Sequence, residues 1–246
     1  MRRYKIKIEY DGIPFVGWQK QENELSVQGC LEQAVKNIFE EDVTVFGAGR
    51  TDAGVHAMGQ VAHFDIINKH FDTHVIKNAI NDHLRPHPIS ILNVVEVDHS
   101  FHARFNAVQR KYLYRVINRK SPLTIEKGRA WHVHKDLNME KMKKCSVLLE
   151  GKHDFTTFRS ANCQSNSPIK TLDEVKISKS GENIYFGFVA KSYLHHQIRS
   201  LVGSIKLVGD ETWTSDDLEN ALKAKDRTMC GALAPPDGLY FMEAKY

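Results

Sequence analysis

The chain has 246 residues, of which 41% are hydrophobic and 26% are charged, as is ordinary for a globular protein. This length can bury a sizeable core in one domain or two. No apolar run approaches the roughly 20 residues that span a bilayer. The N-terminus also passes directly into a strand pattern without the apolar region of a signal peptide. From these features we expect a cytoplasmic protein.

The cysteines and histidines give no sign of a metal site. The chain has four cysteines, which are far apart and form no Cys-x-x-Cys pair: Cys30, Cys145, Cys163 and Cys230. We therefore expect reduced thiols and no zinc. Neither His56 nor His63 has a partner at metal-ligand spacing, and we interpret both as structural residues.

The first half of the chain predicts the element order β-α-β-β-α-β. Residues 4–10 alternate between apolar and polar side chains, which predicts a strand with one buried face. Ser26 is a candidate N-cap for a helix whose apolar stripe runs from Val27 to Phe39. The remaining elements predicted in this half are strands near 43–48 and 60–66, a helix over 73–84 and a strand over 90–97.

The second half predicts a similar order with one added helix. The predicted elements are a strand over 111–118, a helix over 138–149, strands over 171–178 and 183–191, helices over 194–208 and 216–224, and a last strand over 238–244. We interpret the chain as an α+β protein of two ferredoxin-like halves, residues 1–106 and 107–246. Their antiparallel sheets are expected to meet around a central active-site cleft.

Residues 49–56, GRTDAGVH, lie between two short strand-like runs, and the backbone between these runs is broken by Gly47, Gly49, Gly54 and Gly59. Glycine at this density indicates positive φ angles or a close approach to the backbone. The break also carries Arg50 and Asp52 two positions apart, which a turn that needs only solubility would not require. The ordinary alternative is a polar loop in which Asp52 makes an Asx turn.

A basic run lies in the middle of the chain. No acidic residue occurs between His99 and Ile125, where the cations are Arg104, Arg110, Lys111, Arg115, Arg119 and Lys120. Tyr112 and Tyr114 are interleaved with them, and basic residues mixed with aromatic ones suit a surface that binds nucleic-acid phosphates and bases. The alternative is a solvated charged face.

The motif GRTDAGVHA at 49–57 resembles the active-site loop of the tRNA pseudouridine synthase A family. The similarity covers nearly the whole chain, with further matches at 9–12, 17–19, 101–105, 110–114, 153–158, 163–165 and 238–240. Residues 193–199, YLHHQIR, resemble a segment of the family that ends in an arginine, here Arg199. This segment departs from the family pattern, which more often has Phe, Met, Val and Asn in place of Tyr193, Gln197, Ile198 and Ser200.

The resemblance implies an isomerase that converts uridine to pseudouridine in the anticodon stem-loop of tRNA, at positions 38, 39 and 40. It also implies a homodimer in which one tRNA contacts both subunits. The reaction changes no oxidation state and needs no external energy source, so we expect no cofactor and no metal.

The resemblance also assigns roles to individual residues. Asp52 is implied as the nucleophile, Arg199 as its ion-pair partner and Tyr112 as the contact to the target uracil. The ordinary alternatives are a surface cation for Arg199 and a core aromatic for Tyr112. We favour packing for Tyr114.

The remaining predicted contacts concern RNA binding. Arg50 is expected to insert into the RNA stem and hold the place of the flipped base. Arg110, Lys111 and Arg115 are expected to meet phosphates.

Two other functions remain open at this stage. A non-catalytic RNA-binding module would account for the basic run and Tyr112, but not for the Asp52 loop or Arg199. A hydrolase that uses Asp52 would lack an evident general base or metal site.

Overall fold

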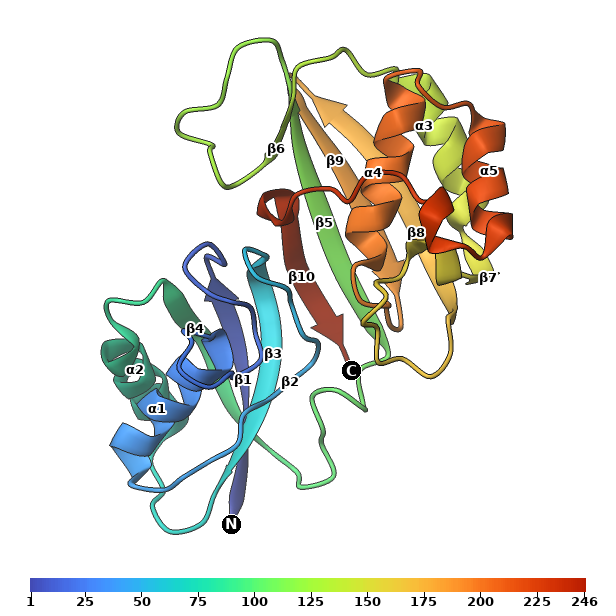
Figure 1. The fold of residues 1–246 in the computed structure, drawn as a ribbon. Coiled ribbons are helices and arrows are strands. Elements are labelled where there is room, and N and C mark those ends of the chain that lie inside the picture. Colours follow the sequence, from blue (N-terminus) through green and yellow to red (C-terminus); the bar gives the residue numbers. More distant parts are fainter. The chain divides into compact units, whose positions relative to one another are not determined.

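The computed structural model describes residues 1–246, which form a mixed α+β fold. The chain divides into two compact units (Figure 1). Unit 1 comprises Met1–Val108 with Tyr240–Tyr246, and unit 2 comprises Gln109–Leu239. This division differs from the expected 1–106 and 107–246 mainly at the end of the chain, because the C-terminal segment packs with unit 1. None of the helices is both long and apolar enough to cross a bilayer.

Unit 1 contains the predicted order β-α-β-β-α-β followed by a last strand. Its elements are β1 (Arg2–Tyr10), α1 (Val27–Phe39), β2 (Phe46–Gly47), β3 (His56–Ile66), α2 (Thr73–Leu84), β4 (Ile89–Val97) and most of β10 (Leu239–Lys245). β1 lies between β4 and β3 and pairs antiparallel with both. β2 pairs antiparallel with β3, and β10 pairs with β3 in parallel.

The core of unit 1 follows from the alternation in β1. Tyr4, Ile6 and Ile8 are fully buried and, as alternate residues of one strand, share a face of the sheet. α1 and α2 cover one face of this sheet (Figure 1). The ring centroids of Tyr4 and Phe64 lie 5.7 Å apart, and Phe39 from α1 packs 6.4 Å from Phe64. This aromatic contact fixes α1 against the sheet.

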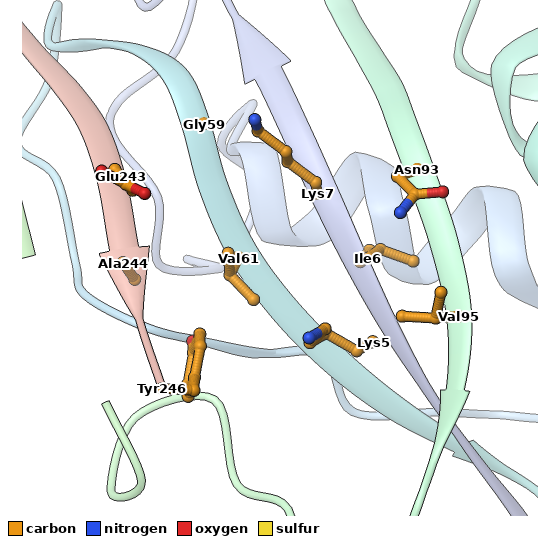
Figure 2. Close-up of a pocket in the computed structure, with 10 residues that line it drawn as sticks. All are labelled: Lys5, Ile6, Lys7, Gly59, Val61, Asn93, Val95, Glu243, Ala244 and Tyr246. Atoms are coloured by element: carbon orange, nitrogen blue, oxygen red, sulfur yellow. The ribbon is translucent and has the colours of Figure 1, made fainter. Parts of the chain in front are cut away.

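The opposite face of the unit 1 sheet carries no helix. Figure 2 shows a pocket on this face, whose lining includes Lys5, Lys7, Gly59, Val61, Asn93, Val95, Glu243, Ala244 and Tyr246. The Nζ atom of Lys5 lies 5.3 Å and 5.6 Å from the ring centroids of Phe101 and Tyr246, within the range of cation–π attraction. The hydroxyl of Tyr246 also donates to the carbonyl of Ala103, at 2.8 Å. These contacts hold the end of the chain in unit 1.

Unit 2 contains four antiparallel strands, one short strand that pairs in parallel, and three α-helices. Its elements are β5 (Gln109–Asn118), β6 (Trp131–Val133), α3 (Met139–Ser146), β7 (Gly151–Asp154), β8 (Ile169–Ser180), β9 (Asn183–Ala190), α4 (Gln197–Gly209) and α5 (Ser215–Ala224). The strands pair in the order β5-β9-β8-β7, and β6 pairs in parallel with β5. The short strands β6 and β7 were not predicted, because each has too few residues to show a pattern.

Candidate active site

The Asp52 loop, which we define as residues 49–55, connects β2 to β3 in unit 1. β2 closes its base, since Gly47 pairs with Ala62 and the N–H of Ala48 donates to the carbonyl of Val61 at 2.7 Å. Within the loop Thr51 is buried and Asp52 is half-buried. The loop therefore buries the Thr51 side chain and leaves that of Asp52 partly accessible.

A polar frame lies buried beneath the loop. The hydroxyls of Tyr10 and Thr51 are hydrogen-bonded at 2.7 Å. The side-chain amide of Gln60, which is fully buried, donates to the carbonyl of Gly49 at 2.9 Å. Burial raises the pKa of Tyr10 to about 12, so its phenol stays neutral at physiological pH. The frame thus holds the loop without placing a second charge below Asp52.

The segment at residues 17 and 18 fixes the loop from one side. Gly17 and Asp52 form an isolated antiparallel bridge, and the N–H of Trp18 donates to the carbonyl of Thr51 at 3.0 Å. Gly17 has a φ of +120°, and a Cβ atom there would lie 2.7 Å from the Thr51 carbonyl oxygen. Only glycine satisfies both the backbone angle and the close approach.

The other end of the loop is packed just as closely. A Cβ atom on Gly12 would lie 2.1 Å from the carbonyl oxygen of Val55. The N–H of Val55 donates to the carbonyl of Asp52 at 3.2 Å, which closes a tight turn. Asp52 therefore lies between two close backbone contacts, at Gly17 and at Gly12, where no side chain would fit.

His56 supports the loop through its ring. Its Nδ1 atom accepts a hydrogen bond from the N–H of Gly12 at 3.0 Å, and its ring stacks on Tyr240 with centroids 4.7 Å apart. The Asp11 carboxylate lies 3.2 Å from the same Nδ1.

His63 is buried away from the loop. Burial, the charge of Arg3 and neighbouring His102 lower the pKa of His63 to about 4. Its Nδ1 accepts from the N–H of Ala103 at 3.2 Å, as a neutral ring requires. His63 therefore has the structural role that was predicted for it.

Tyr112, the residue expected to contact uracil, lies on β5 in unit 2. It is 7% exposed, and its ring meets that of Tyr193 edge to face with centroids 5.1 Å apart. The hydroxyl of Tyr193 donates to the carbonyl of Arg110 at 3.2 Å. Burial raises the pKa of Tyr193 well above its usual value. Tyr193, which stands where the family more often has Phe, therefore packs against Tyr112 and has a hydrogen-bond acceptor for its own hydroxyl.

The neighbours of Tyr112 on β5 have different environments. Tyr114 is fully buried, and its hydroxyl donates to the carbonyl of Pro235 at 2.7 Å, which fits the packing role predicted for it. Arg110 is 8% exposed, and its guanidinium donates to the carbonyl of Lys191. Lys111 is exposed. Of the predicted phosphate contacts, Lys111 therefore lies at the surface and Arg110 is buried.

Arg199 lies in the first turn of α4 in unit 2. Its Nε donates to the carbonyl of Ala234 at 2.8 Å, and the N–H of Ala234 donates back to the carbonyl of Arg199 at 3.2 Å. The helix can approach this segment because it carries Gly203, where a Cβ atom would lie 1.8 Å from the Ala232 carbonyl oxygen. The chain that follows α5 therefore sets the direction of the Arg199 side chain.

Two departures from the family pattern beside Arg199 have local roles. The side-chain oxygen of Gln197 accepts from the N–H of Leu194 at 2.8 Å, which ties down the start of α4. The hydroxyl of Ser200 accepts from Arg227 at 2.8 Å. Both side chains are fully buried, so these residues support the helix and do not reach a substrate.

The basic run is partly neutralised by acidic residues from outside it. Arg115 makes two hydrogen bonds to the carboxylate of Glu126, at 2.7 and 3.0 Å, and one to Asn183 at 2.9 Å. Arg119 pairs with Glu182 at 3.1 Å. The run therefore does not form one continuous basic face.

Comparison with known proteins defines the class of this chain. The family model described as tRNA pseudouridine synthase matches residues 6–106 and 146–246, which include Asp52 and Arg199 but not Tyr112. The chain therefore belongs to the tRNA pseudouridine synthase A family, whose members are isomerases, as the sequence resemblance predicted.

The relatives are similar over their whole length. The tRNA pseudouridine synthase A of Parvibaculum lavamentivorans is 52% identical, with all of both chains covered. That of Sinorhizobium fredii is 53% identical with the same coverage. That of Nitrobacter winogradskyi is also 53% identical, and 96% of its length is covered.

A matched pair of glycine substitutions tests the close packing at Gly17. Gly17→Ala should lower the free energy of unfolding by roughly 2–4 kcal/mol, because it adds strain and a clash with Thr51. Gly181 also has a positive φ, +58°, but a Cβ atom added there would meet nothing within 4 Å. Gly181→Ala should therefore cost only about 1 kcal/mol. Urea unfolding of both variants measures the difference, and equal costs would contradict the proposed contact.

Proposed function

We propose that this chain isomerises uridine to pseudouridine in tRNA, at positions 38, 39 and 40 of the anticodon stem-loop. The observation that carries the proposal is the half-buried carboxylate of Asp52 on a loop whose neighbouring groups are packed and hydrogen-bonded. Membership of the family supports the reaction.

The proposed reaction needs one reactive carboxylate and no cofactor. The bond between N1 of uracil and C1′ of the ribose breaks, the base rotates, and C5 forms the new bond to C1′. C5 then loses its proton to solvent, and N1 gains one, so that substrate and product are isomers. Asp52 either adds covalently to the base or the sugar, or assists a path through a glycal.

Two residues are proposed to hold the target nucleotide. Tyr112 stacks on the uracil, and the edge-to-face contact with Tyr193 supports this role because it fixes the ring. Arg50 is exposed on the same loop as Asp52. It would enter the stem and fill the space that the flipped base leaves.

Arg199 is proposed to pair with Asp52 when the enzyme acts. Its guanidinium carries a permanent charge and a planar set of donors that suits a carboxylate. The hydrogen bond from its Nε to Ala234 supports this role, since it restricts the side chain to one orientation. Such a pair would hold the carboxylate in place during the reaction.

The proposal also covers the fold of the two halves, the oligomeric state and the location of the protein. We infer two ferredoxin-like halves, and the order β-α-β-β-α-β of unit 1 supports the first of them. We further propose a homodimer in which one tRNA contacts both subunits, and a cytoplasmic location where that tRNA is found.

Release of tritium from tRNA that carries [5-³H]uridine tests the reaction. An isomerase passes the C5 tritium to water. An RNA-binding module releases none, and a hydrolase of the glycosidic bond releases free labelled uracil. Tritiated water without free uracil is therefore the expected result. No tritium release, or release of free uracil, would refute the proposal.

Asp52→Asn should abolish tritium release while tRNA affinity and the melting temperature stay near those of the unchanged protein. The amide keeps the shape of the side chain but cannot act as a nucleophile. Activity above about one-hundredth of the original, with deamidation excluded by mass spectrometry, would remove Asp52 from its proposed role.

Arg199→Lys should lower turnover on the order of 100-fold with little change in tRNA affinity, because lysine lacks the planar donors. Arg227→Lys is a matched control, since Arg227 also donates to a backbone carbonyl, that of Thr157, and to α4. The control should lose stability but keep its turnover. Equal turnover in the two variants would argue against a catalytic role for Arg199.

The salt dependence of tRNA binding separates the residues of the basic run. If exposed Lys111 meets one phosphate, Lys111→Gln should flatten the slope of log affinity against log salt by about 0.7–0.9. Arg115→Gln should leave the slope unchanged, because Arg115 is already paired with Glu126. Filter binding over a range of salt concentrations measures both slopes. The reverse order would mean that Arg115 exchanges Glu126 for RNA.

A further inference from the structure

The N-terminus of α1 is bonded to the segment that supports the Asp52 loop. The first backbone N–H groups of a helix have no partners within the helix. Here the N–H of Val27 donates to the carbonyl of Gly17 at 3.2 Å, and that of Gln28 donates to the carbonyl of Trp18 at 2.9 Å. The two residues that bond to the loop on one side are therefore bonded to α1 on the other.

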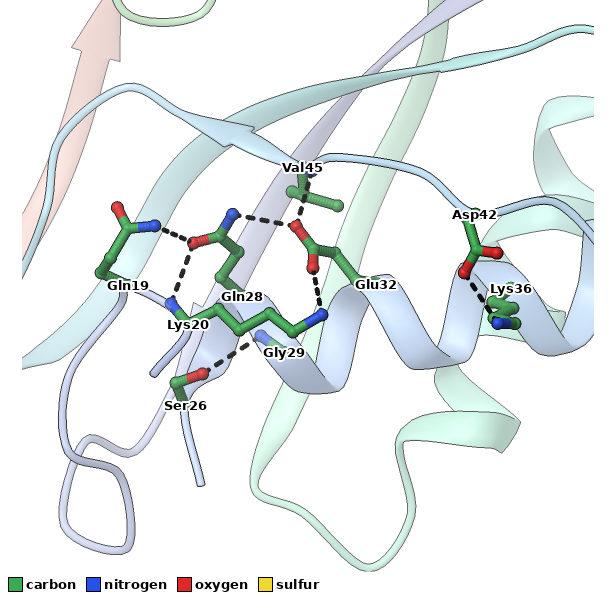
Figure 3. A network of polar contacts seen from close by, with 9 residues as sticks. All are labelled: Gln19, Lys20, Ser26, Gln28, Gly29, Glu32, Lys36, Asp42 and Val45. Carbon is green, nitrogen blue, oxygen red and sulfur yellow. Dashed lines mark hydrogen bonds and ion pairs between the residues drawn. The ribbon is translucent and has the colours of Figure 1, made fainter. Parts of the chain in front are cut away.

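The side chain of Gln28 extends this connection. Its Oε1 accepts from the backbone N–H of Lys20 at 3.0 Å and from the side chain of Gln19 at 2.7 Å (Figure 3). Its Nε2 donates to the carboxylate of Glu32, one turn further along α1, at 2.9 Å. Gln28 is only 7% exposed, so few waters are available to replace these bonds.

Glu32 connects the same network to the strand that enters the loop. The oxygen that accepts from Gln28 also accepts from the backbone N–H of Val45, at 3.1 Å, immediately before β2. Its other oxygen pairs with Lys20 at 3.1 Å, and the side chain is 11% exposed. The two chain segments that flank the Asp52 loop are thus both held by one pair of α1 side chains.

Gln28 and Glu32 can affect the position of Asp52 because the segments that they hold contact each other and the loop. A Cβ atom on Gly47 would lie 2.6 Å from the ring of Trp18, so the strand before the loop and the segment at residue 18 pack directly on each other. A shift of either segment would be passed to the Thr51 carbonyl and to Asp52. A misplacement of about 1 Å can lower a rate about 100-fold.

We propose that Gln28 and Glu32 are positioning residues for the Asp52 carboxylate. They touch neither the loop side chains nor a substrate, and they act by fixing the backbone on both sides of the loop. The proposal rests on the proposed function only in the part that concerns turnover. A purely structural alternative is that the pair does no more than cap α1, which Ser26 already caps through Gly29 at 3.2 Å.

Four substitutions separate these roles. Gln28→Met and Glu32→Met keep the unbranched shape of the side chain but remove its polar atoms. Glu32→Gln keeps an oxygen that can accept from both Val45 and Gln28. Lys36→Met is the matched control on the same helix, since it breaks only the exposed pair of Lys36 and Asp42, 2.7 Å apart (Figure 3).

Turnover and tRNA affinity give the first measurement. The two methionine variants of Gln28 and Glu32 should lose about 10- to 100-fold in turnover at saturating tRNA, with unchanged affinity. Glu32→Gln and Lys36→Met should stay within roughly twofold of the original protein. Unchanged turnover in the methionine variants, despite a lower melting temperature, would overturn the proposal. So would an equal loss in Glu32→Gln.

Amide hydrogen exchange gives a second measurement that does not depend on activity. Glu32→Met should speed exchange of the Trp18 and Val55 N–H groups, and Lys36→Met should not. If Glu32→Met does not fold, Glu32→Asp withdraws the carboxylate by one methylene and should give the same direction of change. Unaltered exchange would overturn the positioning role. Failure of the original protein to release tritium would instead refute the proposed function.

Discussion

The candidate site depends on two contacts in which a carbonyl oxygen of the Asp52 loop lies against a glycine. At Gly12 and Gly17 the backbone approaches Val55 and Thr51 so closely that no β-carbon fits between them. A single buried hydrogen bond stabilises by only about 1 kcal/mol and can be replaced by another. A steric clash with an added β-carbon, in contrast, cannot be relieved by exchanging one partner for another. The position of Asp52 therefore follows mainly from residues that carry no side chain.

Within the space that these steric contacts allow, the hydrogen bonds around the loop stabilise one conformation. Tyr10, Thr51 and Gln60 provide a neutral frame below the loop, and α1 fixes the strands beside it. A loop whose backbone is held in this way loses little conformational freedom when a substrate binds. This suits the proposed reaction, in which a preorganised group has to supply much of the rate enhancement.

The sequence predicted those features that depend on local patterns. The alternation in β1, the Ser26 cap and the order of elements in unit 1 are visible in short windows, and the structure contains them. It also predicted the packing of Tyr114, since alternate residues of a strand share a face. The free state expected for the cysteines agrees with the structure.

The features that were missed depend on residues far apart in the chain. The basic run contains no acidic residue, yet Glu126 and Glu182 reach Arg115 and Arg119 from outside it. Similarly, nothing near residue 110 indicates that the Arg110 guanidinium is buried against Lys191. The packing of Tyr240–Tyr246 with unit 1 likewise depends on pairing between β10 and β3.

Position-resolved detection of pseudouridine in cellular tRNA tests the central claim most directly. The tRNA would be taken from cells that lack this chain and from the same cells after its gene is restored. The account predicts that pseudouridine at positions 38, 39 and 40 is absent from the first sample and present in the second, with all other positions unchanged. Pseudouridine that persists at these positions without the chain, or that returns only at other positions, would contradict it.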